Sequence, residues 1–242
     1  MIKKLLLFTF IAAASRAIAQ DAQCLPERTA MVETIRAYAR SEADILGPQG
    51  ISERVLEAMG QTARHRFIPG GSCSVGYMDR PVLIGHGQTV SQPFIVALMT
   101  HLAAVKSDDT VLEVGTGSGY QAAILARLAR KVCTVEIIPP LAEAAAKALR
   151  ELGYDNVSVK VGDGYQGWPE CGPFDAMIVT AALEHVPPLL IEQLKLGGRL
   201  VMPLGPADTP QQLTVIEKLA PSETRMRSVI PVRFVPFTRS QD

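Results

Sequence analysis

The stretch "VLEVGTGSGYQAAILA", residues 111–126, decides the fold class. It begins as a short apolar run typical of a buried strand and ends as a helix-forming run. Between the two runs stand Gly115, Gly117 and Gly119, which permit unusual backbone angles and let a ligand approach the first N–H groups of the helix. The stretch therefore predicts a strand, a ligand-binding turn and a helix in succession.

The chain beyond this stretch continues to alternate strands with helices. Strands are expected at 131–137, 157–163, 174–182, 197–205, 211–219 and 226–237, and helices at 140–152 and 187–196. The last two strands have no helix between them, so at least one should run antiparallel. The pattern predicts an α/β, doubly wound, Rossmann-like fold whose mostly parallel sheet is covered on both faces and ends in an antiparallel C-terminal strand.

The residues before the glycine turn predict helices and a loop. Residues 26–60 show helical periodicity interrupted by a turn at 47–50, and residues 68–83 form a long loop rich in Gly, Ser and Pro. A helix is expected at 93–105, opened by Pro93. We expect residues 20–83, an N-terminal helical extension with a loop, to form one compact unit with a ligand-binding domain at 84–242.

The first residues, "MIKKLLLFTFIAAASRAIAQ", have the three parts of a secretory signal. Lys3 and Lys4 precede an apolar run, and Ala17-Ile18-Ala19 is a small-x-small cleavage site. Residues 1–19 are therefore expected to be a signal peptide, which places the mature chain in the periplasm or outside the cell. The alternative is an ordinary amphipathic helix on a cytoplasmic protein. The apolar run is too short to serve as a stable membrane anchor.

The charge balance argues against nucleic acid as a partner. The 242 residues include 24 basic and 24 acidic ones, and a chain without the predicted signal would have a net charge of −3. No basic field is available to attract a phosphate backbone.

Four cysteines and four histidines show no metal-binding spacing. Cys133 lies in an apolar run and is expected to be a buried small hydrophobe. Cys24 and Cys73 lie in polar stretches, where an exported protein could join them in a disulfide.

The glycine turn differs from that of dinucleotide-binding proteins. A Gly-x-Gly-x-x-Gly fingerprint would require glycine at position 120, where this chain has Tyr120. The observed spacing is Glu-x-Gly-x-Gly-x-Gly, beginning at Glu113 on the strand itself. This spacing resembles the S-adenosylmethionine loop of class I methyltransferases.

Two further acids follow later strands. Glu136 ends the second strand, where a carboxylate can accept both ribose hydroxyls, although alone it could equally be a solvated strand end. Asp163 follows the third strand, where it can accept the adenine amino group while Gly164 leaves space for the ring. Together with Glu113 these acids predict a nucleoside site at the carboxyl edge of the sheet.

A set of segments makes the resemblance specific. The chain resembles protein-L-isoaspartate O-methyltransferases over residues 30–238, through "RHRFIPG", "IGHGQTVSQP", "VLEVGTGSGYQAAILA", "GDGYQGW", "PFDAMIVTAA", "LKLGGRLVMPLG" and "VRFVPF". The resemblance implies a monomeric enzyme that methylates the free α-carboxyl group of L-isoaspartyl residues in damaged proteins and peptides. The ester then collapses to a succinimide, and its hydrolysis returns some normal aspartate. It also implies cofactor contacts from Thr89 and Val90.

The substrate chemistry requires no general base. An α-carboxyl group has a pKa of about 3.3–3.7 and is ionised at neutral pH. The enzyme then needs to align the reacting atoms and exclude water, an effect worth up to roughly 7–11 kcal/mol. Ser91, which precedes the helix at 93–105, is the predicted catalytic residue and would donate a hydrogen bond to the carboxylate, assisted by the N-terminus of that helix. The alternative is that Ser91 only caps the helix, and His86 is expected to pack the loop or touch the peptide.

Two positions depart from the family pattern, and two other functions stay open. Leu183-Glu184-His185 replaces an expected proline and should line the peptide-binding face, and Phe94 replaces a more usual polar or tyrosine residue. The acceptor could be a small molecule, with residues 68–83 as a lid. An exported protein without cofactor could instead bind damaged chains and catalyse nothing.

Overall fold

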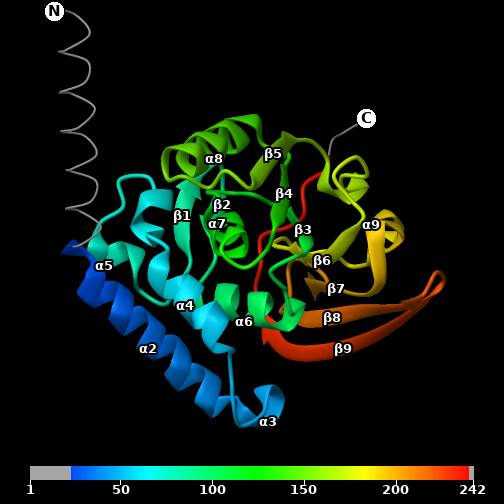
Figure 1. Ribbon diagram of the computed structural model, residues 1–242, viewed down its shortest axis with the longest axis horizontal. Helices are drawn as coiled ribbons and strands as arrows, with labels where there is room; N and C mark the ends of the chain where they lie inside the picture. The colour runs from blue at the N-terminus through cyan, green and yellow to red at the C-terminus, as the bar shows by residue number, and fades with distance from the viewer. Residues whose placement is uncertain (1–22, 240–242) are drawn as a thin grey trace, which may run out of the picture.

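A seven-stranded sheet in the order β5-β4-β3-β6-β7-β8-β9 forms the centre of the computed structural model, which describes residues 23–239 (Figure 1). Its strands are β3 Thr110–Val114, β4 Lys131–Glu136, β5 Val157–Val161, β6 Phe174–Val179, β7 Leu194–Leu204, β8 Gln211–Ala220 and β9 Glu223–Val232. Neighbouring strands from β5 to β7 pair in parallel, whereas β8 is antiparallel to both β7 and β9. The predicted fold class is confirmed.

Helices cover both faces of the sheet, but unequally. They are α2 Leu25–Ser41, α3 Ala43–Leu46, α4 Glu53–Gln61, η1 Arg64–Phe67, α5 Cys73–Gly76, α6 Pro93–Ala103, α7 Tyr120–Ala126, α8 Pro139–Glu151, η2 Gly164–Gln166 and α9 Pro188–Gln193. Side chains alternate along β3, so Val111 packs into the core with α2, α4, α6, α7 and α8, while Leu112 packs into a smaller core with α9. Most of the helices therefore pack against the face of the sheet on which Val111 lies.

The strand order locates the ligand-binding edge. From β3 the chain moves outward to β4 and β5, then returns to place β6 on the other side of β3. In a doubly wound sheet such a reversal opens a crevice at the carboxyl ends of the two central strands. Those ends are Val114 and Val179, and Gly115 and Thr180 follow them directly.

The predicted long loop is partly structured. It contains α5, and its end enters a small antiparallel hairpin of β1 Val82–Gly85 and β2 Gln88–Val90. The sequence analysis missed this hairpin because its strands are only four and three residues long. Gly85, His86 and Gly87 make the turn with positive φ, and glycines adopt such angles without strain.

Two predicted helices are shorter than expected. The helix after the glycine turn ends at Ala126 rather than Arg130, because the N–H groups of Arg130 and Lys131 donate to the Asp109 carbonyl instead of continuing the helical hydrogen bonds. The helix expected at 187–196 ends at Gln193, because Leu194 pairs with Phe174 of β6 and starts β7. In the second case tertiary pairing overrides a locally helical pattern.

The four cysteines form two pairs. Cys24 and Cys73 are joined with a Cα–Cα distance of 5.1 Å, so the disulfide links the start of α2 to α5. Cys133 is fully buried as expected but is paired with Cys171, which precedes β6. The sequence analysis missed this second pair because only the folded sheet brings the two segments together.

Some expectations concern the ends of the chain. The predicted signal segment, residues 1–19, lies outside the described residues. Within residues 23–239 no helix is both long and apolar enough to cross a bilayer.

Candidate active site

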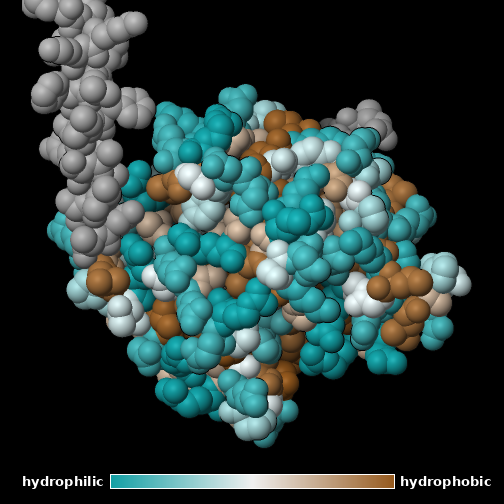
Figure 2. Space-filling view, viewed as in Figure 1, coloured by the Kyte–Doolittle hydropathy of each residue, from teal (hydrophilic) through white to brown (hydrophobic). Residues whose placement is uncertain are grey.

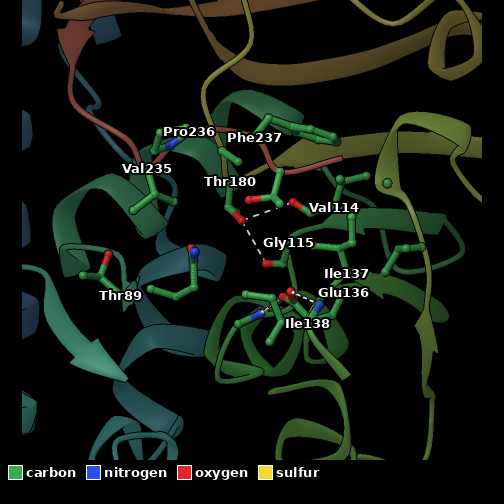
Figure 3. A pocket seen from close by; sticks show the side chains of 16 residues that line it. Thr89, Val114, Gly115, Glu136, Ile137, Ile138, Thr180, Val235, Pro236 and Phe237 are labelled. Atoms are coloured by element: carbon green, nitrogen blue, oxygen red, sulfur yellow. Dashed lines mark hydrogen bonds between the residues drawn. The ribbon is translucent and has the colours of Figure 1, made fainter. Parts of the chain in front are cut away.

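A cleft opens at the carboxyl edge of β3 and β4, as the strand order requires (Figure 3). It is lined by Gln88, Thr89, Val114, Gly115, Gly117, Val135, Glu136, Ile137, Ile138, Gly164, Thr180, Ala181, Val235, Pro236, Phe237 and Thr238. Of the predicted cofactor residues, Thr89, Gly115, Gly117, Glu136 and Gly164 line this cleft.

The first glycine of the turn leaves no space for a side chain beneath the cleft. Gly115 has φ +94°, and a Cβ added there would collide with the hydroxyl of Thr180. That hydroxyl donates to the carbonyls of Gly115 at 2.9 Å and Val114 at 3.1 Å, which fixes the turn against β6 (Figure 3). Gly119 has φ +89° and is the N-cap of α7, so it shapes the turn without lining the cleft.

Glu136 forms one wall of the cleft at the end of β4. Its carboxylate is 5% exposed and accepts the N–H groups of Gly117 at 2.8 Å and Ile138 at 3.0 Å. A carboxylate has about four acceptor sites, so both oxygens can still accept hydroxyls from a ligand. Ile137 and Ile138 extend this wall with apolar side chains (Figure 3).

Glu113 lies deeper, under an inner cavity that Thr89, Val90 and Ser91 also line. It is fully buried, and one carboxyl oxygen accepts the Thr134 hydroxyl at 2.6 Å. The other oxygen has no partner among residues 23–239. Burial, with a smaller contribution from the charge of Glu136, raises the pKa of Glu113 to about 8. The base of the cavity therefore offers an unsatisfied carboxyl oxygen to a polar ligand group.

Asp163 follows β5, next to Gly164 but outside the lining of the cleft. Its carboxylate accepts the N–H of Tyr165 at 2.9 Å and lies 3.4 Å from the Arg239 guanidinium, and it does not line the cleft. Gly164 does line it, and a Cβ at this glycine would collide with Val114. The space beside Gly164 is thus present, whereas the adenine contact of Asp163 stays a prediction.

A second cavity adjoins the cleft through three shared residues, Thr89, Thr180 and Val235. Its other lining residues are Pro81, Ser91, Gln92, Ile95, Ala207, Pro231, Val232, Arg233 and Phe234. This lining contains no histidine and no carboxylate. We call it the acceptor cavity, because an acceptor bound there would face a donor bound in the cleft.

Ser91 lies where the acceptor cavity meets the inner cavity. Its hydroxyl has no hydrogen-bond partner in the part of the chain that the structure describes, so it is free to bind a ligand. Its carbonyl accepts the Arg64 guanidinium at 2.7 Å.

The cap of α6 comes from elsewhere. The N-cap residue is Gln92, whose side chain makes no cap bond. Asp79 accepts the N–H of Phe94 at 2.8 Å and the side-chain amide of Gln92 at 2.7 Å. The alternative that Ser91 only caps this helix is therefore wrong. Sequence reasoning missed Asp79 because it lies in the distant loop, where no local spacing marks it.

Two other parts of the chain considered in the sequence analysis lie outside the cleft, the inner cavity and the acceptor cavity. His86 is exposed at the tip of the β1–β2 turn and lines none of these cavities. Residues 23–239 contain no group of His, Cys, Asp and Glu suited to a metal ion. Leu183, Glu184 and His185 line a separate groove with Tyr165 and Phe237, and this groove shares Ala207 with the acceptor cavity.

The sequence also did not predict the residues at which the cleft, the acceptor cavity and the inner cavity meet. Thr180 lines the cleft, the acceptor cavity and the inner cavity. Val235 and Phe237 close the cleft opposite Glu136 (Figure 3). The segment "VRFVPF" carries part of the resemblance, but nothing in its local pattern shows that the residues after β9 reach the cleft at the edge of the sheet.

Comparisons with known proteins agree with this geometry. The model of the protein-L-isoaspartate(D-aspartate) O-methyltransferase family matches residues 44–242. Protein-L-isoaspartate O-methyltransferase 2 of Polaromonas sp. is 53% identical over 86% of this chain and 99% of its own. Protein-L-isoaspartate O-methyltransferase 1 of Cupriavidus necator is 52% identical over 90% of this chain and 85% of its own.

Solved structures show the same fold. A protein-L-isoaspartate O-methyltransferase aligns with TM-score 0.76 and 27% identity over 86% of this chain and 65% of its own. A Plasmodium falciparum protein in complex with S-adenosyl-L-homocysteine aligns with TM-score 0.72 and 24% identity over 87% of this chain and 98% of its own. With a family model that spans most of the sequence and relatives more than half identical, the chain belongs to the protein-L-isoaspartate(D-aspartate) O-methyltransferase family.

Proposed function

We propose that the protein transfers a methyl group from S-adenosylmethionine to the free α-carboxylate of L-isoaspartyl residues in damaged proteins and peptides. Beyond family membership, one observation carries this proposal. The acceptor cavity presents a free serine hydroxyl beside the nucleotide cleft and contains no group that could act as a base. Such a cavity suits an acceptor that is already ionised.

The residues of the cleft fit the cofactor. Glu136 would accept the ribose hydroxyls, Ile137 and Ile138 would pack on the adenine, and the glycine turn would let the amino-acid part approach Glu113. The bound cofactor supplies an electrophilic methyl group on a sulfonium. We expect S-adenosylhomocysteine but not NAD to bind in calorimetry, because Tyr120 occupies the position of the third dinucleotide glycine.

Ser91 would hold the acceptor. Its hydroxyl would donate to one oxygen of the carboxylate and aim the other oxygen at the junction formed by Thr89, Thr180 and Val235. Assistance from the N-terminus of α6 is weaker than the sequence suggested, since the Asp79 carboxylate already takes the Phe94 N–H there. The positioning of the carboxylate, rather than proton transfer, would provide the rate enhancement.

The test compares matched acceptors with labelled S-adenosylmethionine. An isoaspartyl peptide should be methylated, whereas its normal aspartyl counterpart and small carboxylic acids should not. Methylation of the small acids alone would favour the small-molecule reading. Failure to methylate any acceptor, by protein that binds S-adenosylhomocysteine, would favour a non-catalytic binder of damaged chains.

We also propose that the mature chain begins near Gln20 and acts in the periplasm or outside the cell. The tripartite start of the sequence and the Cys24–Cys73 disulfide support export, because disulfides persist in oxidising compartments. Mass spectrometry of protein from the native host should find the processed chain. Recovery of the intact Met1 form from the cytosol would refute export.

We also propose that the protein is a monomer and does not bind nucleic acid. Hydrophobic residues form small separate patches on the face in Figure 2, and strongly exposed ones such as Leu83 and Leu196 are far apart in sequence. The basic and acidic residues balance. Light scattering should give the mass of one chain, and a duplex DNA titration should leave that mass unchanged.

A further inference from the structure

Arg64, the first residue of η1, is the largest of the fully buried side chains among the described residues. Its Nη2 donates to the Ser91 carbonyl at 2.7 Å, and its guanidinium carbon lies 4.6 Å from the centre of the Tyr120 ring. Its Nε and Nη1 have no hydrogen-bond partner anywhere in residues 23–239. Two donor nitrogens of a buried cation thus lack an acceptor, although the neighbouring Tyr120 side chain favours its charged form.

The charge of Arg64 also lacks an adjacent counter-ion. No carboxylate of the described chain forms an ion pair with it, and Asp79 acts on it only from a distance. Burial lowers the pKa of Arg64, but an arginine stays protonated at neutral pH. Burying a charge without a paired partner is costly, and such costs persist mainly where function requires them.

The position of this charge relates it to the acceptor. The carbonyl that Arg64 binds belongs to Ser91, a residue that lines the acceptor cavity. On the other side of the same turn, the Asp79 carboxylate offsets the positive end of α6. Arg233 lines the acceptor cavity but is exposed, so solvent and salt screen it. Arg64 is therefore a buried positive charge that is linked by one hydrogen bond to Ser91, the residue proposed to hold the carboxylate.

We propose that Arg64 is a positioning residue that fixes the Ser91 backbone and supplies the positive field that holds the acceptor carboxylate. This inference rests on the proposed function, because it assumes that a carboxylate binds at Ser91. Tyr120 holds the guanidinium in place by stacking, so the charge needs no reorganisation when the acceptor arrives.

A purely structural role makes a different prediction. If Arg64 only joins η1 to Tyr120, its loss should lower the binding affinity for all acceptors by the same factor. If its charge holds the carboxylate, its loss should weaken a carboxylate acceptor more than an uncharged one of the same shape. The useful readout is therefore a ratio of two affinities measured on the same variant.

The experiment uses protein saturated with S-adenosylhomocysteine. Calorimetry would give the affinities for an isoaspartyl peptide and for the same peptide with an α-carboxamide in place of the α-carboxylate. Arg64→Met and Arg64→Gln should reduce the preference for the carboxylate about tenfold, as expected for loss of one charge at moderate distance in a partly screened site. Arg64→Lys should stay within about threefold of the unmodified protein.

Arg28→Met is the matched control. Arg28 is also buried, donates to the Tyr77 hydroxyl at 3.1 Å and lies over the Tyr77 ring, but lines none of the cavities. This variant should keep the preference for the carboxylate.

Each outcome decides between the roles. An unchanged ratio in Arg64→Met and Arg64→Gln, with normal S-adenosylhomocysteine binding, would overturn the proposal. If Arg64→Met does not fold, equal ratios in Arg64→Lys and Arg64→Gln would overturn it, and a ratio kept only by Arg64→Lys would support it. If the unmodified protein neither binds nor methylates the isoaspartyl peptide, the proposed function itself has failed.

Discussion

In the proposed mechanism, Ser91 offers the acceptor a hydrogen-bond donor and no base. Its hydroxyl is free, and the lining of the acceptor cavity contains neither imidazole nor carboxylate. A carboxylate nearby would repel an anionic nucleophile, and a tight salt bridge would make it less reactive. The Ser91 hydroxyl, with the Arg64 guanidinium hydrogen-bonded to the carbonyl of the same residue, would orient the anion and leave its reacting lone pair available.

Replacing Ser91 with alanine should therefore reduce turnover and spare cofactor binding. A hydrogen bond to a charged group is worth about 1.5–3 kcal/mol, so we expect a loss of roughly ten- to a hundredfold in kcat/KM for an isoaspartyl peptide. S-adenosylhomocysteine affinity, measured by calorimetry, should change little. His86→Gln is the control and should keep most of the rate. Loss of activity in His86→Gln together with a silent Ser91→Ala would refute the base-free mechanism.

Glu113 should make stability depend on pH. Burial raises its pKa to about 8 in the folded protein, from an ordinary value near 4.5. Between these values the folded state holds a proton that the unfolded state has lost, so stability falls as pH rises, by at most about 1.4 kcal/mol per pH unit. Urea unfolding of ligand-free protein from pH 5 to 8 should show this decline relative to Glu113→Gln. Parallel pH curves for the two proteins would refute the raised pKa.

At the scale of elements, the turn before α6 is held from two sides. Asp79 accepts hydrogen bonds from Gln92 and Phe94, and Arg64 donates one to the carbonyl of Ser91, the residue before Gln92. Both anchoring side chains precede residue 84, whereas the turn that they bind follows it. In the proposed mechanism, residues 23–83 would therefore help to set the geometry of the acceptor site.

Asp79→Ala should weaken both the helix and the site. Loss of a cap acceptor costs about 0.5–2 kcal/mol of unfolding free energy, and a looser turn should lower kcat for the isoaspartyl peptide. Asp155→Ala, at an exposed position, is the matched control and should change stability by less than about 0.5 kcal/mol. Urea unfolding and steady-state kinetics check both effects. Unfolding free energies that match in the two variants would show that Asp79 is not the cap.

The features that the sequence could predict are those that lie within a single element. Strands β3, β4 and β6 are short runs rich in apolar and β-branched residues, and the glycines of the turn have a recognisable spacing, so their places were expected. Asp79, Arg64 and Thr180 were not, because each acts on a segment remote in sequence. Val235 and Phe237 gave no signal for the same reason. A single sequence shows local periodicity, whereas contacts between distant segments depend on how the strands are ordered.

At the scale of the whole molecule, one core runs from the N-terminal helices into the sheet. It includes Met31 of α2, Met59 of α4, Leu98 of α6 and Val111 of β3. We therefore expect residues 23–83 and the remainder of the chain to unfold together, as a two-state transition. The Cys24–Cys73 disulfide closes part of this extension on itself.

Removing that disulfide should lower stability without altering the site. A loop of this size predicts a loss of about 2–4 kcal/mol in the Cys24→Ser, Cys73→Ser double variant. Urea unfolding under oxidising conditions measures the loss, and the same experiment with reductant should abolish the difference between the two proteins. Equal stability of both proteins without reductant would show that this disulfide contributes little.

The central claim is that this fold holds an ionised α-carboxylate against the cofactor's methyl group. Tandem mass spectrometry of an isoaspartyl peptide after incubation with protein and S-adenosylmethionine tests it most directly. We expect a single methyl ester on the α-carboxyl of the isoaspartyl residue, followed by loss of methanol to the succinimide, and no ester on the aspartyl counterpart. A methyl group on any other atom, or equal methylation of both peptides, would contradict it.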